Sequence, residues 1–383
     1  MKVAVIGAGT MGSGIAQVAA QAGHTTYLFD TRKEAVDKAV AGLTKTFDRL
    51  VEKGKLSAEE AKATLARIVP ATDLKELAGC GLVIEAIIED LGVKKRLVAE
   101  LETILPHEAV LATNTSSLSV TAIAGACATP ERVIGLHFFN PAPLLPLVEV
   151  VPGLATDGTL ATRMATLMQA WGKAPVVCKD TPGFIVNRVA RPFYGEAIRI
   201  FEEGIADMPT IDAAMKGVGF RMGPFELMDL IGNDINFTVT RTVWEAFFYD
   251  PRYKPSFTQQ RQVESGRLGR KSGRGYYSYV DGASEPVIPV DPALAAAIVE
   301  RILAMLINEA ADALFWQVAS AADIDRAMTK GVNYPKGLLA WADELGAKHW
   351  LNVLLVLQAR YGEDRYRPSP LLLEATLKGN SLR

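Results

Sequence analysis

The sequence predicts an α/β N-terminal part with a doubly wound, mainly parallel sheet, followed by two tandem all-α helical repeats. Three observations support this prediction. Short apolar runs alternate with amphipathic helical patterns through the first half of the 383 residues, as expected for strands joined by helical crossovers. From about residue 184 the helical period dominates, and within that helical region the sequence repeats itself.

The first strand and the turn after it carry a specific pattern. Lys2–Ile6 is a short apolar run, followed at once by a turn of the form G-x-G-x-x-G that begins at Gly7. A helical pattern comes next, and then a second apolar run over 26–29 that ends in Asp30. A lone G-x-G-x-x-G is weak evidence for a nucleotide site. Here the strand, turn, helix, second strand and acidic residue occur together, and this is the complete dinucleotide-binding arrangement of a Rossmann-type fold.

Each residue of this turn has a physical task. Gly7 permits the tight turn, Gly9 lets the backbone approach a pyrophosphate, and Gly12 lets the helix pack against the strand. The helix N-terminus, at Thr10 and Met11, offers N–H groups and a partial positive charge to the phosphates. The alternative is a glycine-rich turn without a ligand, which the complete pattern disfavours.

Asp30 indicates which dinucleotide the turn binds. Its carboxylate can accept hydrogen bonds from the hydroxyl groups of a ribose and would repel a 2′-phosphate, so the sequence favours NAD over NADP as cofactor. Arg32, two residues later, weakens that preference somewhat.

Composition narrows the class of protein. A formal net charge of −2 gives no reason to expect a nucleic acid or an anionic membrane as partner. Cys80, Cys127 and Cys178 show no paired spacing, which is typical of reduced thiols. No signal-peptide pattern precedes the first strand, and no apolar run is long enough to cross a membrane. We therefore expect a cytoplasmic protein with no membrane span and no bound metal.

The later elements continue the alternation. We expect, in chain order, a long helix after Asp30, a helix that begins with a capping box at Ser57, a strand over 80–87, a helix over 93–105, and strands over 109–113, 132–139 and 147–151. Ligands of such sheets bind outside the carboxyl ends of the strands. Polar residues that directly follow strands are therefore the candidates for function.

Two boundaries divide the chain. One falls near 181–183, where strands give way to helices, and the other lies in a segment rich in Pro, Gly, Asp and Ser over 280–292. We expect an NAD-binding domain over 1–181, a helical substrate and assembly domain over 182–284, and a second helical repeat over 285–383.

The helical regions are copies of one unit. Residues 211–215 match residues 324–328, and Glu196 matches Glu309, both 113 positions apart. Two copies of a helical unit can bury their apolar faces on each other.

His137 and Glu149 are the strongest candidates for chemistry. His137 lies in an apolar, aromatic segment, and Glu149 interrupts a strand that is otherwise Leu and Val. A buried carboxylate needs a partner, and an imidazole is a suitable one, since the pair would fix the tautomer of the ring and stabilise its protonated form. Oxidation of an alcohol by a nicotinamide needs such a base. From the local sequence alone, a structural buried histidine is the alternative.

Ser116 and Asn187 could hold the reacting oxygen by hydrogen bonds. The alternative for Ser116 is a helix N-cap, a task that Ser117 could take instead. The alternative for Asn187 is a polar residue on a helix surface.

Several longer motifs resemble those of the L-3-hydroxyacyl-CoA dehydrogenase family, 3-hydroxybutyryl-CoA dehydrogenases included. The motifs are NTSSL (114–118), HFFNP (137–141), LVEV (147–150), KDTPGFIVNR (179–188) and GPFEL (223–227). The resemblance covers about residues 1–280, and the second repeat resembles the extra C-terminal unit of longer members and of multifunctional fatty-oxidation proteins. It implies NAD-dependent oxidation of an L-3-hydroxyacyl-CoA to the 3-oxoacyl-CoA.

The resemblance also assigns roles to residues. His137 matches the catalytic base, Glu149 the acid that pairs with it, and Ser116 and Asn187 the contacts to the substrate oxygen. Further matches are Asp30, Glu89, Lys94 and Asn114 around the ribose and nicotinamide, Thr46 and Lys53 near the CoA portion, and Asn140 near the substrate. Thr46 replaces what is often Ser, and a solvated helix face is the alternative explanation for Lys53.

The second repeat departs from the family pattern. Asn187 corresponds to Glu300, and neither a glycine-rich turn nor a His–Glu pair accompanies the copy, so we expect it to be structural. Short family members are dimers through their helical domain. This chain would then be a monomer that forms a pseudo-dimer from its tandem repeat, or a homodimer through another surface.

Two alternatives to the dehydrogenase remain from the sequence. One is a non-catalytic dinucleotide-binding structural protein of the same fold. The other is a dehydrogenase of similar architecture that acts on a free hydroxy acid or sugar acid. The sequence leaves open the acyl chain length and whether the acyl end carries a carboxylate, and the pathway could be β-oxidation, butanoate metabolism or aromatic degradation.

Overall fold

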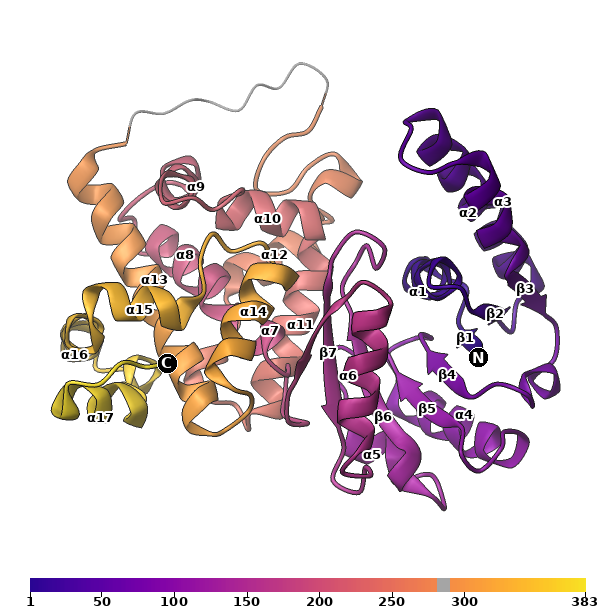
Figure 1. Cartoon of the computed structure of the whole chain (residues 1–383). Helices are drawn as coiled ribbons and strands as arrows, with labels where there is room; N and C mark the ends of the chain where they lie inside the picture. The colour runs from indigo at the N-terminus through magenta and orange to yellow at the C-terminus, as the bar shows by residue number, and fades with distance from the viewer. Residues whose placement is uncertain (281–289) are drawn as a thin grey trace. The chain divides into compact units, whose positions relative to one another are not determined.

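A computed structural model describes residues 1–280 and 290–383, which form two compact units, Met1–Phe184 and Ile185–Arg383 (Figure 1). The first unit contains the sheet, and the second is helical. The predicted boundary between residues 284 and 285 lies outside the described residues.

The first unit follows the predicted alternation of strands and helices. Its elements are β1 (Lys2–Ile6), α1 (Thr10–Gln21), β2 (Thr25–Phe29), α2 (Lys33–Glu52), α3 (Ala58–Ala66), β3 (Ile68–Ala71), η1 (Leu74–Leu77), β4 (Leu82–Glu85), α4 (Leu91–Ile104), β5 (Val110–Thr113), α5 (Val120–Ala124), η2 (Pro130–Arg132), β6 (Val133–Phe138), β7 (Leu147–Pro152), α6 (Leu160–Ala170) and β8 (Ala174–Val177). The capping box of α3 is present, since Ser57 and Glu60 each accept a hydrogen bond from the other's backbone N–H.

The strands form one sheet in the order β3-β2-β1-β4-β5-β6-β7-β8. Neighbouring strands are parallel except β6 and β7, which are antiparallel. The prediction of a doubly wound, mainly parallel sheet is confirmed. Its two edge strands, β3 and β8, were not predicted.

Both faces of the sheet are covered by helices. Val3 and Val5 face the layer formed by α1, α2, α3 and α6, whereas Ala4 and Ile6 face the layer of η1, α4 and α5. These four side chains are at most 2% exposed, and full burial of a Val or Ile side chain contributes about 1.5–3 kcal/mol. A strand buried on both faces explains why β1 reads as a continuous apolar run.

Within the described residues of the second unit, the regular elements are helices. They are α7 (Val186–Val189), α8 (Arg191–Glu202), α9 (Met208–Gly217), α10 (Pro224–Ile231), α11 (Asn233–Ala246), η3 (Pro251–Tyr253), α12 (Phe257–Glu264), η4 (Arg270–Ser272), α13 (Pro292–Phe315), α14 (Ala321–Gly331), α15 (Leu338–Leu345), α16 (Ala347–Tyr361), η5 (Asp364–Tyr366) and α17 (Pro370–Lys378). Among the helices of the described residues, none has the length and apolar character needed to span a bilayer.

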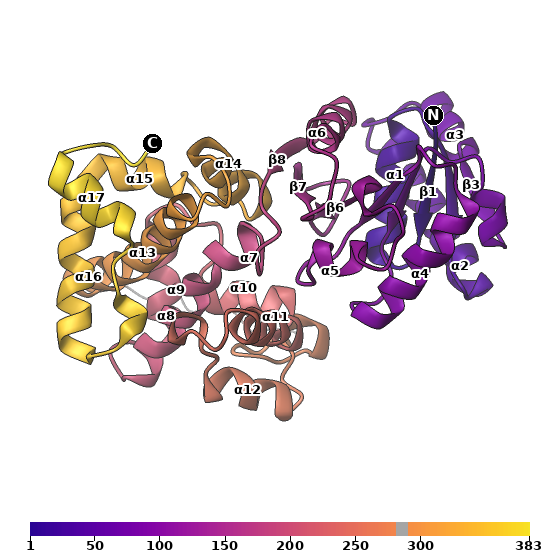
Figure 2. The same ribbon diagram turned by 90° about the horizontal axis from the view of Figure 1, so that it is seen from below.

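The helical unit contains the same succession of elements twice. α8, α9, α10, α11, η3 and α12 of the first copy correspond, in this order, to α13, α14, α15, α16, η5 and α17 of the second. In Figure 2, α13 lies between helices of the two copies, and it packs against α8 and α9 of the first copy and α15, α16 and α17 of its own. The predicted repeat of a helical unit is therefore a repeat of structure.

Equivalent residues of the two copies form reciprocal ion pairs with each other. Arg188 Nε donates to Glu309 Oε1 over 2.6 Å, and Arg301 Nε donates to Glu196 Oε2 over 2.9 Å. Positions 188 and 301 are equivalent in the repeat, as are 196 and 309. This reciprocal pairing is the pattern of a two-fold symmetric interface between identical subunits, here formed within one chain.

Candidate active site

The polar candidate residues of the first unit lie along the side of the sheet where the parallel strands have their carboxyl ends. β1, β2, β4, β5 and β6 run in the same direction, so Gly7, Asp30 and Asn114, which directly follow strands, lie at their carboxyl ends. β7 is antiparallel and begins at this edge, which places Glu149 directly opposite His137 in the ladder. The sequence places the acid in an apolar strand, and the strand direction brings it to the histidine.

His137 and Glu149 form a buried pair. The His137 Nδ1 and Glu149 Oε2 atoms are 2.6 Å apart, and the side chains are 7% and 0% exposed. The rings of Phe139 and Phe184 lie 4.4 and 5.9 Å from the imidazole, centroid to centroid. The pair is thus buried beside two aromatic rings. Burial away from water strengthens the hydrogen bond to the carboxylate.

The glycine-rich turn has the geometry that its pattern predicts. Gly7 has a φ of +102°, and a Cβ there would lie 2.5 Å from the carbonyl oxygen of Ala86. A Cβ on Gly12 would lie 1.7 Å from the carbonyl oxygen of Gly7. These two glycines are therefore required by the protein's own packing, at the turn and where α1 crosses β1.

Gly9, unlike Gly7 and Gly12, is not required by contacts within the protein and leaves room for a ligand. A Cβ at Gly9 would meet no protein atom within 4 Å, and its φ of −73° is open to any residue. Gly9 is also the N-cap of α1, no side chain caps this helix, and its first turn carries no acidic residue. The turn thus leaves open space in front of a helix N-terminus, the arrangement that accepts a pyrophosphate.

Asp30 is held in place by the backbone beside it. Its Oδ2 accepts a hydrogen bond from Ala8 N over 2.9 Å, and its Oδ1 accepts one from Arg32 N over 3.0 Å. The Arg32 side chain is 78% exposed, and its Nε lies 3.7 Å from the same carboxylate. Asp30 therefore joins the glycine-rich turn to the end of β2, the position from which an acidic residue contacts a ribose.

Glu89 anchors the loop that carries Ser116. Its Oε1 accepts hydrogen bonds from Thr115 Oγ1 over 2.7 Å, Ser116 N over 2.9 Å and Ser117 N over 3.1 Å. Lys94 lies beneath it, with its Nζ 3.3 Å from Glu89 Oε2. One carboxylate thus fixes the backbone of a proposed substrate residue.

The Glu89→Gln variant tests this anchoring. Burial raises the pKa of Glu89, but the Lys94 ammonium and the hydrogen bonds from Thr115 and Ser116 outweigh it, so its pKa lies below the usual value. A depressed carboxyl pKa stabilises the fold above the unfolded value of about 4.3, and this stabilisation is lost as the pH falls through the folded pKa. The Tm of the wild type should exceed that of the variant at neutral pH and approach it below about pH 4. A difference in Tm that stays constant over this range contradicts the anchoring role.

The buried carboxylate of Glu85 is a further residue near the site that the sequence motifs do not single out. Lys94 Nζ donates to its Oε1 over 2.6 Å and Thr113 Oγ1 to its Oε2 over 2.6 Å, with both ion-pair side chains 1% exposed. The signal was an acidic residue within the apolar strand 82–85, the same signal that identified Glu149. Through Lys94, Glu85 supports the loop that Glu89 anchors.

The remaining candidates have simple surroundings. Asn114 Oδ1 accepts a hydrogen bond from Phe138 N over 2.8 Å, which ties the end of β5 to β6 beside His137. Thr46 is exposed on α2, Lys53 is exposed at its C-cap, and Asn140 is exposed after β6. Asn187 is partly buried and lies on α7 of the helical unit.

The N-cap of α5 is neither Ser116 nor Ser117, the two residues that the sequence offers for this position. Ser119 is the N-cap, and its hydroxyl accepts from Ala122 N over 3.1 Å. Asp180 adds a second cap by accepting hydrogen bonds from Val120 N and Thr121 N. The N-cap interpretation of Ser116 is therefore wrong, because the N-cap position lies three residues later and the helix begins at Val120.

A sheet of this topology, with a nucleotide turn and a buried base–acid pair at the same edge, is the architecture of an NAD-dependent dehydrogenase. Residues 2–181 match the family model described as 3-hydroxyacyl-CoA dehydrogenase, NAD binding domain. Residues 183–279 and 298–382 match that of the 3-hydroxyacyl-CoA dehydrogenase C-terminal domain. The chain belongs to the 3-hydroxyacyl-CoA dehydrogenase family.

Known relatives span one or both helical copies. A 3-hydroxyadipyl-CoA dehydrogenase of Escherichia coli (strain K12) is 44% identical, over 98% of this chain and 97% of the relative. The crystal structure of a 3-hydroxybutyryl-CoA dehydrogenase from Escherichia coli K12 matches with a TM-score of 0.92 at 42% identity, covering 99% of this chain and 98% of that one. A (S)-3-hydroxybutyryl-CoA dehydrogenase from Ralstonia eutropha matches with a TM-score of 0.71 at 38% identity, and 73% of this chain covers 99% of that one.

Proposed function

We propose that this chain catalyses the reversible NAD-dependent oxidation of an L-3-hydroxyacyl-CoA to the 3-oxoacyl-CoA, in fatty acid or related acyl-CoA degradation. The 2.6 Å hydrogen bond between His137 and Glu149 carries the proposal, because oxidation of an alcohol needs a base for the hydroxyl proton. The names of the relatives, which include 3-hydroxyadipyl- and 3-hydroxybutyryl-CoA dehydrogenases, support the substrate class. When bound, NAD supplies the hydride acceptor.

His137 is the proposed general base. With Nδ1 bonded to Glu149, the other ring nitrogen, Nε2, is the atom that takes the proton of the 3-hydroxyl group as the C3–H bond breaks. Glu149 keeps Nδ1 protonated and stabilises the imidazolium that results. In the reverse direction the imidazolium returns the proton to the 3-oxo oxygen.

Ser116 and Asn187 are the proposed contacts to the reacting oxygen, with Asn140 as a further substrate contact. The backbone of Ser116 is fixed by Glu89, and the carbonyl oxygen of Asn187 accepts a hydrogen bond from Arg191 Nε over 2.9 Å. Side chains on backbone that is fixed in this way orient a substrate at a low entropic cost.

The cofactor-binding residues are proposed to lie at the nucleotide turn and in the loops beside it. They are Gly7, Gly9, Thr10, Met11, Gly12, Asp30, Glu89, Lys94 and Asn114. The open space at Gly9 supports this set, and Lys94 would act through Glu89 because it is buried beneath it. Thr46 and Lys53 are the proposed contacts to the CoA portion, and both are exposed on or next to α2.

The activity is tested by following NADH oxidation with acetoacetyl-CoA, then with longer and with ω-carboxylated 3-oxoacyl-CoAs. Turnover of any of them establishes the dehydrogenase, and the ratio of kcat/KM among them gives the acyl preference. Free 3-oxo acids serve as controls for the need for CoA. NADH binding without turnover of any substrate would favour the non-catalytic dinucleotide-binding protein.

We propose one chain as the functional unit, a pseudo-dimer of its two helical copies. The reciprocal pairs of Arg188 with Glu309 and Arg301 with Glu196 support this proposal, since they satisfy within one chain the contacts of a symmetric interface. Light scattering should give the mass of one chain at micromolar concentration. The mass of two chains would instead indicate a homodimer through another surface.

The proposed domains are the NAD-binding domain over 1–181, the helical substrate domain over 182–284 and the second repeat over 285–383. The family models end and begin close to the first of these boundaries. A cytoplasmic location is also proposed, and the free thiols of Cys80, Cys127 and Cys178 are compatible with it.

A further inference from the structure

Asn187 lies on a helix too short to orient itself. α7 has four residues, Val186–Val189, and Ala190 separates it from α8. Pro192, in the first turn of α8, lacks the N–H that would continue the helical ladder to the carbonyl of Arg188. In the second copy the corresponding stretch belongs to one continuous helix, α13. Because single helical turns have little stability of their own, the direction of the Asn187 side chain depends on the contacts that hold α7.

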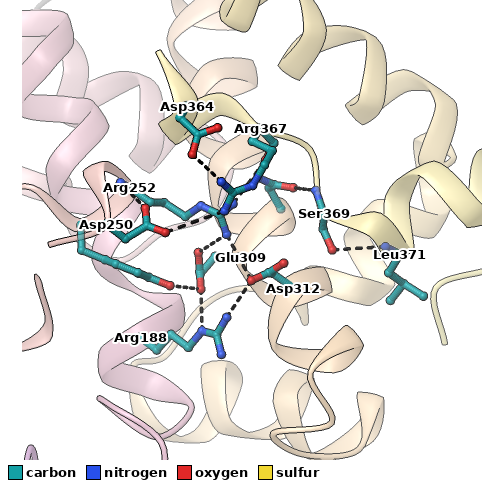
Figure 3. A network of polar contacts seen from close by, with 11 residues as sticks. Arg188, Asp250, Arg252, Glu309, Asp312, Asp364, Arg367, Ser369 and Leu371 are labelled. Atoms are coloured by element: carbon teal, nitrogen blue, oxygen red, sulfur yellow. Dashed lines mark hydrogen bonds and ion pairs between the residues drawn. The ribbon is translucent and has the colours of Figure 1, made fainter. Parts of the chain in front are cut away.

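One group of these contacts comes from the second copy. Arg188, next to Asn187, donates from Nε to Glu309 Oε1 over 2.6 Å and from Nη2 to Asp312 Oδ2 over 2.9 Å. Both carboxylates belong to α13, and Figure 3 shows them meeting the Arg188 guanidinium from the facing helix. The Arg188 side chain is 3% exposed and that of Glu309 is 0% exposed. Charge-assisted pairs of this geometry are strong and directional.

Glu309 is itself held rigidly. Arg252 Nη1 lies 3.2 Å from its Oε2, and Tyr253 OH donates to its Oε1 over 2.5 Å. Burial raises the pKa of Glu309, but the two guanidinium groups outweigh it and hold the pKa below the usual value. With Asp312, the cluster has two cations and two anions. The carboxylate is therefore a fixed anchor for Arg188.

We propose that Glu309, assisted by Asp312, is a positioning residue for the reaction: through Arg188 the second copy sets the orientation of α7 and of Asn187. The inference rests on the proposed role of Asn187 as a substrate contact. It gives the second copy a task beyond the structural one expected from its missing Asn, since α13 supplies an anchor next to a residue that it does not itself contain.

The repeat provides a matched control in the same molecule. Around Glu196, the equivalent of Glu309, Arg301 Nε donates over 2.9 Å and Tyr366 OH donates over 2.9 Å. Glu196 is 2% exposed. Glu300 stands where the first copy has Asn187. The two clusters thus share a buried glutamate with an arginine and a tyrosine as donors, although Arg199 stands beside Glu196 where the Glu309 cluster has Asp312. Only the Glu309 cluster adjoins a proposed substrate residue.

The test compares Glu309→Gln with Glu196→Gln. Both variants should lower Tm by a similar amount, because each leaves a buried guanidinium short of one charge. Only Glu309→Gln should lower kcat, by about 10-fold or more, since a displacement of about 1 Å in a positioning group can reduce a rate 100-fold. NADH affinity, which depends on the first unit, should stay within about twofold of the wild type in both. Equal kcat values in the two variants overturn the proposal.

A milder pair serves if the charge variants fail to fold. Tyr253→Phe removes the hydroxyl that donates to Glu309, and Tyr366→Phe removes the hydroxyl that donates to Glu196. Tyr366 OH also accepts from Arg301 Nη2 over 2.8 Å, so its loss perturbs its cluster at least as much. A lower kcat in Tyr253→Phe than in Tyr366→Phe supports positioning through Glu309, and the reverse order contradicts it.

A double-mutant cycle with Asn187→Ala separates this inference from the proposed function. If Glu309 acts through Asn187, the Glu309→Gln substitution lowers kcat when Asn187 is present. The same substitution changes kcat little when Asn187 is already replaced by Ala. If Asn187→Ala lowers kcat and Glu309→Gln lowers it again by the full factor, the positioning role fails while the proposed function stands. If Asn187→Ala leaves kcat unchanged, the proposed role of Asn187 fails, and with it the basis of the inference.

Discussion

His137→Gln is expected to lower kcat for the reduction of acetoacetyl-CoA by about 100- to 10,000-fold, the range of general acid–base catalysis. Glutamine can still hydrogen-bond to Glu149 from the same position, but it cannot donate and take up a proton at the reacting oxygen. NADH oxidation under saturating substrate measures the loss. A fluorescence titration should show NADH affinity within about twofold of the wild type, because the nucleotide turn is untouched.

His107→Gln is the matched control. His107 is exposed in the loop between α4 and β5, so the same replacement there should leave kcat unchanged. If His137→Gln retains activity within about 10-fold of the wild type, His137 is not the base, and the buried pair with Glu149 is a structural feature of the sheet.

Gly12→Ala is expected to remove NADH binding and to destabilise the first unit. Its Cβ would lie 1.7 Å from the carbonyl oxygen of Gly7 and 2.8 Å from the carbonyl carbon, so α1 must move away from β1. Overpacking of this kind costs about 1–3 kcal/mol. The same movement carries the helix N-terminus away from the phosphates. Thermal unfolding and an NADH titration measure the two effects.

Gly9→Ala separates the ligand from the fold. Its Cβ would meet no protein atom within 4 Å, so Tm should stay unchanged while the added methyl group fills the space in front of α1. We expect NADH affinity to fall about 10- to 100-fold, which corresponds to about 1.4–2.8 kcal/mol. Unchanged affinity in Gly9→Ala would place the pyrophosphate elsewhere.

The fold was predictable where the sequence pattern has one physical cause. β1 and β2 are buried apolar runs, and the glycine-rich turn joins the first of them to α1. The strands that escaped prediction are β3 and β8, and each contains a proline, Pro70 and Pro175. A proline argues against an interior strand because it donates no ladder hydrogen bond. Both strands lie at the edges of the sheet, where that donor is not needed, and edge position cannot be read from the chain.

The candidate site was predictable in part for a similar reason. An acidic residue in an apolar strand must have a partner, and from the sequence alone this argument pairs Glu149 with His137. The same argument applies to Glu85, but its partner Lys94 lies on a helix nine residues later, where a solvated lysine is the usual expectation. The choice of partner for a buried charged side chain depends on how the helices pack on the sheet. The sequence identifies the need for a partner more readily than the partner itself.

The internal repeat was visible as an offset of 113 positions, but its contacts were not. Matching residues such as Glu196 and Glu309 suggested two similar folds, and nothing in the spacing indicated that each would pair with an arginine of the other copy. Reciprocal contacts are a property of how two surfaces meet.

The covalent joining of the two helical copies has a consequence for how they change over time. In a dimer of identical chains every substitution is made twice, at both ends of the symmetry axis, and dilution can separate the halves. Here each half is encoded separately and stays tethered at any concentration. Asp312 can therefore stand where the first copy has Arg199, and Glu300 where it has Asn187. One half can keep the proposed substrate contact, Asn187, while the other half takes on its proposed positioning.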